Sequence, residues 1–70
     1  MLGDRRAVKA LADRLASDPY VPVRAEIAEV LGTLGDRAAL PALQRAALHE
    51  TESQVTASIR AAIALLSKIH

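Results

Sequence analysis

One pair of adjacent residues in this 70-residue chain, His49 and Glu50, has the types that bind a metal ion. Imidazole and carboxylate groups are both common metal ligands. A metal site needs several such groups to converge, and the chain offers this one pair and no cysteine. A histidine near a helix C-terminus is also favoured without a metal, because positive charge suits the helix dipole there. The sequence therefore predicts no metal site, and the last residue, His70, is expected to lie in a frayed terminus.

Nucleophilic catalysis requires a nucleophile, a base and a group that orients the base, all held close together. The candidate nucleophilic hydroxyls are scattered along the chain, at Ser17, Ser53, Ser58 and Ser67. The sequence has no Gly-x-Ser-x-Gly motif and no glycine-rich phosphate loop, and its three glycines do not cluster. We expect a protein that is not an enzyme, with no catalytic residues and no cofactor.

Nucleic-acid binding would need a basic surface, and the formal net charge is only +1. The basic residues that could form a ridge on the first and third helices are Arg5, Arg6, Lys9 and Arg37. The acidic residues that share this surface are Asp4, Asp13 and Asp36. The only aromatic side chain, Tyr20, gives nucleic-acid bases little to stack on. The pattern predicts a solvated helix face and no nucleic-acid partner.

No apolar run approaches the roughly 18 residues that a transmembrane helix needs. The N-terminus lacks the apolar segment of a signal peptide. These features predict a cytoplasmic protein with no membrane partner. Seven arginines against two lysines indicate a GC-rich bacterial source.

Alanine and leucine, with fifteen and ten residues, dominate the hydrophobic composition. Both types lead the scale of helix propensity. Valine and isoleucine nowhere alternate with polar residues over the length of a strand. The chain is therefore predicted to be all-α, and an alanine-rich core indicates helices that approach each other closely.

The chain repeats itself at an offset of 32 residues, without a gap. The segment Leu2-Gly3-Asp4 recurs as Leu34-Gly35-Asp36. The other pairs that coincide at this offset include Ala7 with Ala39, Leu11 with Leu43, Val23 with Val55, Ala25 with Ala57, Ile27 with Ile59 and Leu34 with Leu66. A period between 20 and 50 residues is typical of a solenoid or repeat array. We expect one domain over residues 1–70, with repeat 1 at about 2–33 and repeat 2 at about 34–70.

Each repeat is predicted to form two antiparallel helices, four in all. Asp4 is a good N-cap for the first helix, and Pro22 suits the first turn of the second. Gly35 suits the position that follows a helix, and Asp36 is expected to cap the third helix directly. Ser53 is expected to cap the fourth helix.

This layout resembles the HEAT-repeat family, specifically the short repeats named after phycobilisome lyases. The family pattern runs as Leu-Gly-Asp, Arg-Ala-Val-Pro-Ala-Leu, Asp-Pro, Val-Arg and Ala-Leu-Gly. The matching segments are 2–4, 7–11, 18–19, 23–24 and 30–32 in the first copy, and 34–36, 37–43 and Val55 in the second. The second copy departs from the pattern at Glu50-Thr51 and at Thr56, which is typical of a terminal repeat.

The resemblance implies an α-solenoid fragment of two HEAT-like hairpins that acts as a non-catalytic protein-interaction or scaffold module. In such arrays the second helix of each repeat lines the concave side. The partner-binding residues expected there are Arg24, Ala28, Glu29, Thr56, Arg60 and Ser67. HEAT-like deoxyhypusine hydroxylases bind iron through His-Glu pairs, but these lie near the start of a repeat's second helix, unlike His49-Glu50.

The resemblance also raises the question of what covers the ends of the stack, since two repeats are fewer than the three usually needed for stability. The strip Ala25, Ala28 and Gly32 is expected to receive the following repeat. The equivalent strip on the fourth helix is Ala57, Ala61 and Ala64, which is expected to contact a further repeat, another protein or a second copy. Two other functions stay open, a fragment or small subunit of a HEAT-like enzyme such as a bilin lyase, and a helical homodimerisation domain.

In the family, an acidic residue in the turn often pairs with an arginine that opens the second helix. Asp18 and Arg24 match these positions, and the resemblance therefore implies that they clamp the turn. Tyr20 lies in the same turn, where it either contributes to an interface or covers the end of the small core.

Overall fold

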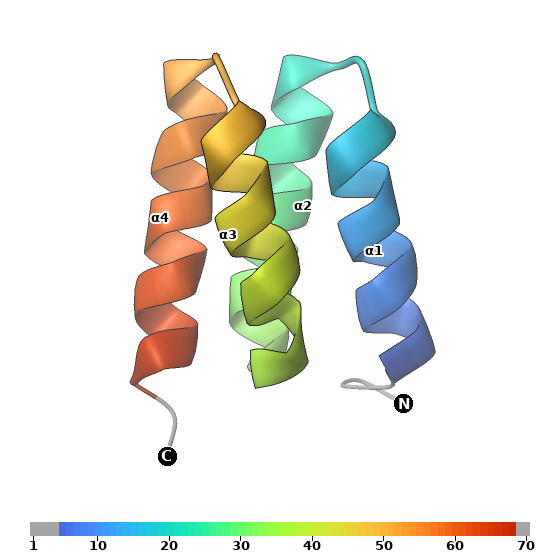
Figure 1. Ribbon diagram of the computed structural model, residues 1–70, viewed down its shortest axis with the longest axis vertical. Coiled ribbons are helices and arrows are strands. Elements are labelled where there is room, and N and C mark those ends of the chain that lie inside the picture. Colours follow the sequence, from blue (N-terminus) through green and yellow to red (C-terminus); the bar gives the residue numbers. More distant parts are fainter. Residues whose placement is uncertain (1–4, 69–70) are drawn as a thin grey trace.

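The computed structural model describes residues 5–68, which form four α-helices. They are α1 (Arg5–Ser17), α2 (Val21–Leu34), α3 (Leu40–His49) and α4 (Ser53–Ser67), and a short 3-10 helix, η1 (Arg37–Ala39), precedes α3. Successive α-helices run antiparallel (Figure 1). Residues 5–68 contain no strand, so the all-α prediction is confirmed. The predicted cap Asp4 and the terminal His70 lie outside the described residues.

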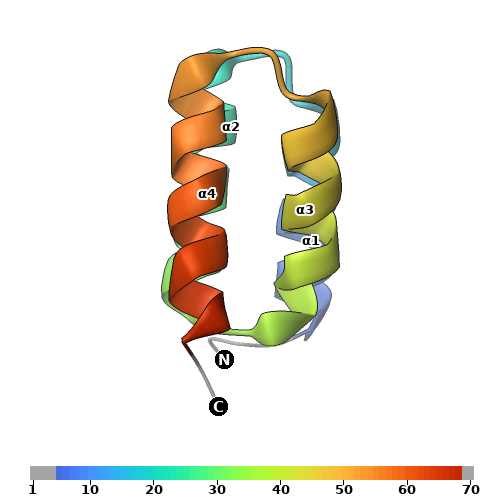
Figure 2. The ribbon, with the colours of Figure 1, turned by 60° about the vertical axis from the view of Figure 1, so that its left-hand side comes forward.

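The two hairpins, α1–α2 and α3–α4, stack on each other in the same orientation. Viewed along the stack, α4 lies over α2 and α3 lies over α1 (Figure 2). The molecule therefore has two layers, α1 with α3 and α2 with α4, and the most extensive contact is between α2 and α4. This is the α-solenoid arrangement that the 32-residue repeat predicts.

The connection between the hairpins follows the predicted chemistry, with one added turn. Gly35 takes a left-handed conformation with φ 73°, which favours glycine, and it ends α2. The Asp36 carboxylate accepts a hydrogen bond from the Ala38 backbone N–H at 2.9 Å. Asp36 thus caps η1 and not α3 itself. Pro41 explains the extra turn, because it has no N–H to bond the carbonyl of residue 37 and its ring excludes that carbonyl.

The fourth helix begins differently from the prediction. Ser53 is the first residue of α4, and the residue at the N-cap, Glu52, makes no side-chain capping bond. Instead, the Glu50 carboxylate accepts hydrogen bonds from the backbone N–H groups of Thr51 and Glu52, both at 3.1 Å. The prediction that Ser53 caps this helix is therefore wrong, because a longer acidic side chain three residues earlier satisfies the turn that leads into it.

The hydrophobic core fills the space between the two layers and joins both hairpins. Its largest fully buried side chains are Leu31, Leu43, Val55, Ile59 and Leu66. The second helix contributes two different faces to this core. Ile27 and Leu31 belong to the predicted main stripe, whereas Ala25, Ala28 and Gly32 form the predicted small strip, and all five are buried.

The small strip lets α2 and α4 approach to the limit that the backbone allows. A Cβ atom placed on Gly32 would lie 2.9 Å from the Ala62 Cα and 3.0 Å from its Cβ. Real Cβ atoms essentially never approach another atom so closely, so only glycine fits at this position without a shift of the helices. The expectation that the following repeat packs on this strip is confirmed.

A side chain at position 32 should therefore push the two hairpins apart. We expect Gly32→Val to lower the free energy of unfolding by about 2 kcal/mol or more, the range measured for overpacked cores. The matched control is Ala64→Val at the equivalent exposed position of α4, which should cost only about 0.5 kcal/mol through lower helix propensity. Urea denaturation followed by circular dichroism measures both values. Equal losses in the two variants would contradict the tight contact.

Candidate functional site

The guanidinium of Arg24, near the start of α2, donates three hydrogen bonds to two different loops. Its Nε and Nη2 atoms each donate a hydrogen bond to one oxygen of Glu50, both at 3.0 Å. Its Nη1 donates to the backbone carbonyl of Asp18 at 2.9 Å. The side chains of Arg24 and Glu50 are only 16% and 8% exposed. A paired, largely sheltered contact of this kind is among the stronger ion pairs that proteins form.

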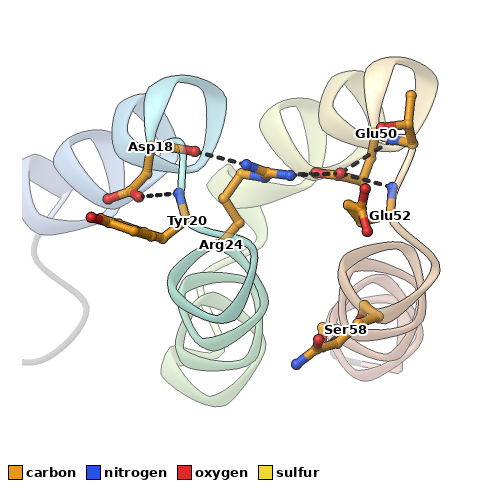
Figure 3. Close-up of polar contacts among 8 residues, drawn as sticks. Asp18, Tyr20, Arg24, Glu50, Glu52 and Ser58 are labelled. Atoms are coloured by element: carbon orange, nitrogen blue, oxygen red, sulfur yellow. Dashed lines mark hydrogen bonds and ion pairs between the residues drawn. The ribbon is translucent and has the colours of Figure 1, made fainter.

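We call Arg24 with its partners Glu50 and the Asp18 carbonyl the Arg24 clamp. It joins the two hairpins at the end of the molecule that holds the α1–α2 and α3–α4 loops. Figure 3 shows Arg24 lying between the α1–α2 turn on one side and Glu50, at the end of α3, on the other. Because Glu50 also accepts the backbone N–H groups of Thr51 and Glu52, one carboxylate organises its own turn and binds the preceding hairpin. The Arg24 clamp therefore fixes the spacing of the two loops.

The two loops share one design, which the offset of 32 makes visible. In the first loop the Asp18 carboxylate accepts the Tyr20 N–H at 2.9 Å. At the equivalent positions of the second loop the Glu50 carboxylate accepts the Glu52 N–H. The remaining oxygen of Asp18 accepts from the Arg14 Nε at 3.1 Å, within its own hairpin. Glu50 thus occupies the family's Asp-Pro position, and its longer side chain also reaches an arginine of the neighbouring hairpin.

The predicted pairing of Asp18 with Arg24 is partly confirmed. Arg24 does hold the turn, but it binds the Asp18 carbonyl and not the Asp18 carboxylate. The carboxylate that neutralises Arg24 is Glu50, 26 residues away in the sequence. The repeat offset could have identified this partner, because position 50 is position 18 moved by one period.

The electrostatics of the loops follow from these contacts. The hydrogen bond from Arg24 lowers the pKa of the Glu50 carboxyl below its usual value, and the backbone N–H groups of Glu52 and Thr51 add to the effect against the opposing cost of burial. The hydrogen bond from the Tyr20 N–H is the largest cause that lowers the pKa of Asp18. The Glu50 hydrogen bond likewise raises the pKa of the Arg24 guanidinium. All three groups are therefore held in their charged forms at neutral pH.

The contacts of Glu50 also bear on the His49-Glu50 pair. Both oxygens of Glu50 accept hydrogen bonds from Arg24, so the carboxylate is committed to the clamp. Within residues 5–68, no group of three or more histidine, cysteine, aspartate or glutamate side chains could hold a metal ion.

Two of the surface hollows formed by residues 5–68 lie beside charged side chains. The first, a groove of about 380 Å³ between α1 and α3, has alanines in its walls, and Arg24 and Glu50 also line it. The second, a groove of about 470 Å³ along α2, is lined by Glu26, Glu29, Val30, Thr33 and Leu34. The first groove is lined by the paired Arg24 and Glu50 and by exposed side chains of both charges, Asp13 and Arg45, whereas the charged residues of the second groove are both acidic and lie beside apolar side chains. The second groove is therefore the better candidate for binding another molecule.

The structure separates the six predicted partner-binding residues. Ala28 is 0% exposed and lies in the core, so it is not available to bind a partner. Arg24 is committed to the clamp. Glu29, Arg60 and Ser67 are exposed and Thr56 is half-buried. The prediction placed the free face about one position away from its true place, because residues 24 and 28 turn toward the next hairpin.

The side of α2 and α4 that is exposed to solvent carries mostly other residues than those predicted to bind a partner. On α2 it carries Glu26, Glu29 and Thr33, and the equivalent positions of α4 carry Ser58, Ala61 and Leu65. We call these six residues the inner face. The Glu29 carboxylate accepts a hydrogen bond from the Ser58 hydroxyl at 3.4 Å, across the two helices. The spacing of three and four residues along each helix could have identified this face once the core stripe was known.

The other predicted contact residues are exposed. Ala57, Ala61 and Ala64 all lie on the open side of α4, next to Leu65, which is 50% exposed. Tyr20 is 71% exposed. Of its two possible roles, covering the end of the core is therefore excluded, and a role in an interface stays open.

Comparison with known proteins was informative at the level of the family. A family model described as HEAT repeats matches residues 1–64. No curated protein and no solved structure matches the chain significantly. A search of the described residues finds no helix long and apolar enough to cross a membrane.

Removal of the Arg24 clamp should destabilise the whole molecule. We expect Arg24→Ala to lower the melting temperature by about 8 °C, because it leaves the sheltered Glu50 carboxylate without its counter-ion. The matched control is Lys9→Ala, whose side chain is 78% exposed and pairs with the 70% exposed Asp13, and which should change the melting temperature by less than about 2 °C. Thermal melts followed by circular dichroism compare the two. A loss no larger than that of the control would show that the clamp does not hold the hairpins.

The clamp should also give the stability a defined dependence on pH. Because the pKa of Glu50 is lowered in the folded state, its contribution is complete above its unfolded pKa of about 4.3 and is lost as pH falls through the folded value. The stability difference between the wild type and Glu50→Gln should thus be constant near neutral pH and shrink below about pH 4. Urea titrations at a series of pH values measure it. A difference that is unchanged at acidic pH would contradict an ionised Glu50 in the clamp.

Proposed function

Since the chain belongs to the HEAT-repeat family, we propose that it is a non-catalytic module that binds another protein through the inner face. The observation that carries this proposal is the groove of about 470 Å³ on α2, where Glu26 and Glu29 lie beside the exposed Val30 and the half-buried Leu34. A concave surface with a few polar groups beside apolar ones is the usual form of a recognition site.

The chemistry of the inner face favours a partner segment that is both basic and apolar. Glu26 and Glu29 supply two negative charges on successive turns of α2. Val30 is 38% exposed at the edge of the groove, and Leu65 is 50% exposed on α4. An amphipathic helix with lysine or arginine on one side of its apolar stripe meets these requirements. Two carboxylates also repel the phosphates of nucleic acid, in agreement with the predicted absence of such a partner.

The repeats are proposed to be of the short, phycobilisome-lyase type, with repeat 2 as a terminal repeat. The segments Val23-Arg24 and Leu34-Gly35-Asp36 support the type, and both have clear structural roles here. Thr56 supports the terminal position, because it replaces the arginine that would clamp a following loop. Of the residues first expected to bind the partner, Glu29 belongs to the inner face, whereas Thr56, Arg60 and Ser67 lie on a different side of α4.

The inner face is tested by reversing its charge. The wild-type chain, immobilised on a resin, should capture a partner from a lysate of its own source, and mass spectrometry identifies that protein. We expect the variant Glu26→Lys with Glu29→Lys to bind the purified partner at least about tenfold more weakly, since interface charge pairs contribute strongly to specificity. Asp13→Lys, an acidic residue on the exposed side of α1, is the matched control and should bind normally. Equal binding by the double variant and the control would exclude the inner face.

A further inference from the structure

The interface between the two hairpins shows which residues become buried when one hairpin packs on the next. In the second hairpin, Leu43, Val55 and Leu66 are 0% exposed and Ala62 is 1% exposed. One period earlier, the first hairpin has Leu11, Val23, Leu34 and Val30 at these positions. We call these four residues the N-terminal end face. They are equally apolar, but Val30 is 38% exposed and the other three are half-buried.

The opposite end of the stack carries the other half of the same interface. Ala25 and Ala28 are 3% and 0% exposed because α4 covers them, and Gly32 is buried beside them. At the offset of 32 their equivalents on α4 are Ala57, Arg60 and Ala64, so Arg60 and not the predicted Ala61 completes the strip, and all three are exposed. We call these three residues, together with Thr56 in the place of Arg24, the C-terminal end face.

We propose that the C-terminal end face of one copy packs on the N-terminal end face of a second copy, in a head-to-tail arrangement. Each face is one half of an interface that the chain already forms within itself, so the two faces match in shape and polarity. Their charges are also opposite. Asp18 and Glu26 lie on or beside the N-terminal end face, whereas Arg60 and Lys68 lie on or beside the C-terminal one.

Arg60 takes over part of the role that Arg24 plays inside the chain. It stands one helical turn after Thr56, at the position of Ala28. Side chains on a helix lean toward its N-terminus, so Arg60 leans toward the end of the molecule that holds the loops. In a stacked second copy that end presents Asp18, the equivalent of Glu50, and Arg60 would share or replace the bond that the exposed Arg14 makes to its carboxylate. The small Thr56 leaves room for this approach.

The contact between copies must be wider than the contact within a chain. Ala64 and Val30 replace Gly32 and Ala62, the pair in closest contact, and both replacements are larger. The association should therefore be weak and reversible, with a dissociation constant of about 10–500 µM. Because the two faces differ, the contact does not close on itself, and copies add to form rings or open stacks.

The proposal is tested with two variants, each of which blocks one end. Val30→Arg places a bulky cation on the N-terminal end face, and Ala57→Arg does the same on the C-terminal one. Sedimentation velocity at concentrations up to about 1 mM, the range for weak interfaces, gives the oligomeric state of the wild type and of each variant. We expect the wild type to self-associate and each variant alone to stay monomeric. An equimolar mixture should form a 1:1 dimer that grows no further, since each variant supplies the face that the other lacks.

Every other outcome contradicts the head-to-tail contact. A wild type that stays monomeric overturns self-association altogether. Self-association of Val30→Arg alone would indicate a symmetric contact between two C-terminal end faces, and self-association of Ala57→Arg alone one between two N-terminal end faces. Leu48→Arg, at a position 82% exposed on α3, is the control and should associate like the wild type.

Folding of the variants is checked by circular dichroism before sedimentation. Where either variant lost its helical spectrum, Val30→Lys or Ala64→Gln would replace it, since Ala64 is also exposed on α4. The inference stands apart from the proposed function, because it is measured on the purified chain with no other protein present. Failure of self-association leaves the inner face untouched. Because Glu26 also lies beside the N-terminal end face, partner binding is measured with Glu29→Lys alone as well, and that variant leaves both end faces intact.

Discussion

Each hairpin of this chain leaves an apolar face that the hairpin itself cannot cover, and the fold depends on the other hairpin covering it. The contact between α2 and α4 meets this need, because Gly32, Ala25 and Ala28 let the two helices approach closely. The Arg24 clamp then fixes the loops at one end of that contact. The apolar contact is non-directional, whereas the ion pair has a defined geometry. Together they fix the position of one repeat relative to the next.

The fold was predictable because its determinants are periodic. An offset of 32 residues, the glycine at position 35 and the spacing of leucine and isoleucine are all visible in a single sequence, and the structure follows them. The details that the sequence did not predict arise at the junctions. Pro41 imposes an extra 3-10 turn before α3, and Glu50 orders the turn before α4, while no side chain caps that helix. At both places a side chain acts on backbone groups several residues away, which helix propensity does not describe.

The candidate site was less predictable, for a geometric reason. An error of one residue rotates a helical position by about 100°, which is enough to move it from the free surface into the core. Ala28 and Arg24 were expected on the concave side by analogy with repeat arrays, yet both turn toward the next hairpin. Glu26 and Leu65 lie on the free face and were missed. The correct register follows only when the contact between α2 and α4 is known, because that contact fixes the rotation of both helices.

The differences between the repeats carry more functional information than their similarities. Where the two copies agree, as at Ile27 and Ile59, the residue serves the core common to every hairpin. At two positions beside the contact between the hairpins they differ, and there the first copy has the residue that suits this contact. Arg24 becomes Thr56 and Ala28 becomes Arg60, so the second hairpin loses the internal clamp and gains a charge on its outer side. An outer face that combines a cation with retained small residues can still receive another surface, but it selects one that supplies negative charge, which the first hairpin does at Asp18 and Glu26.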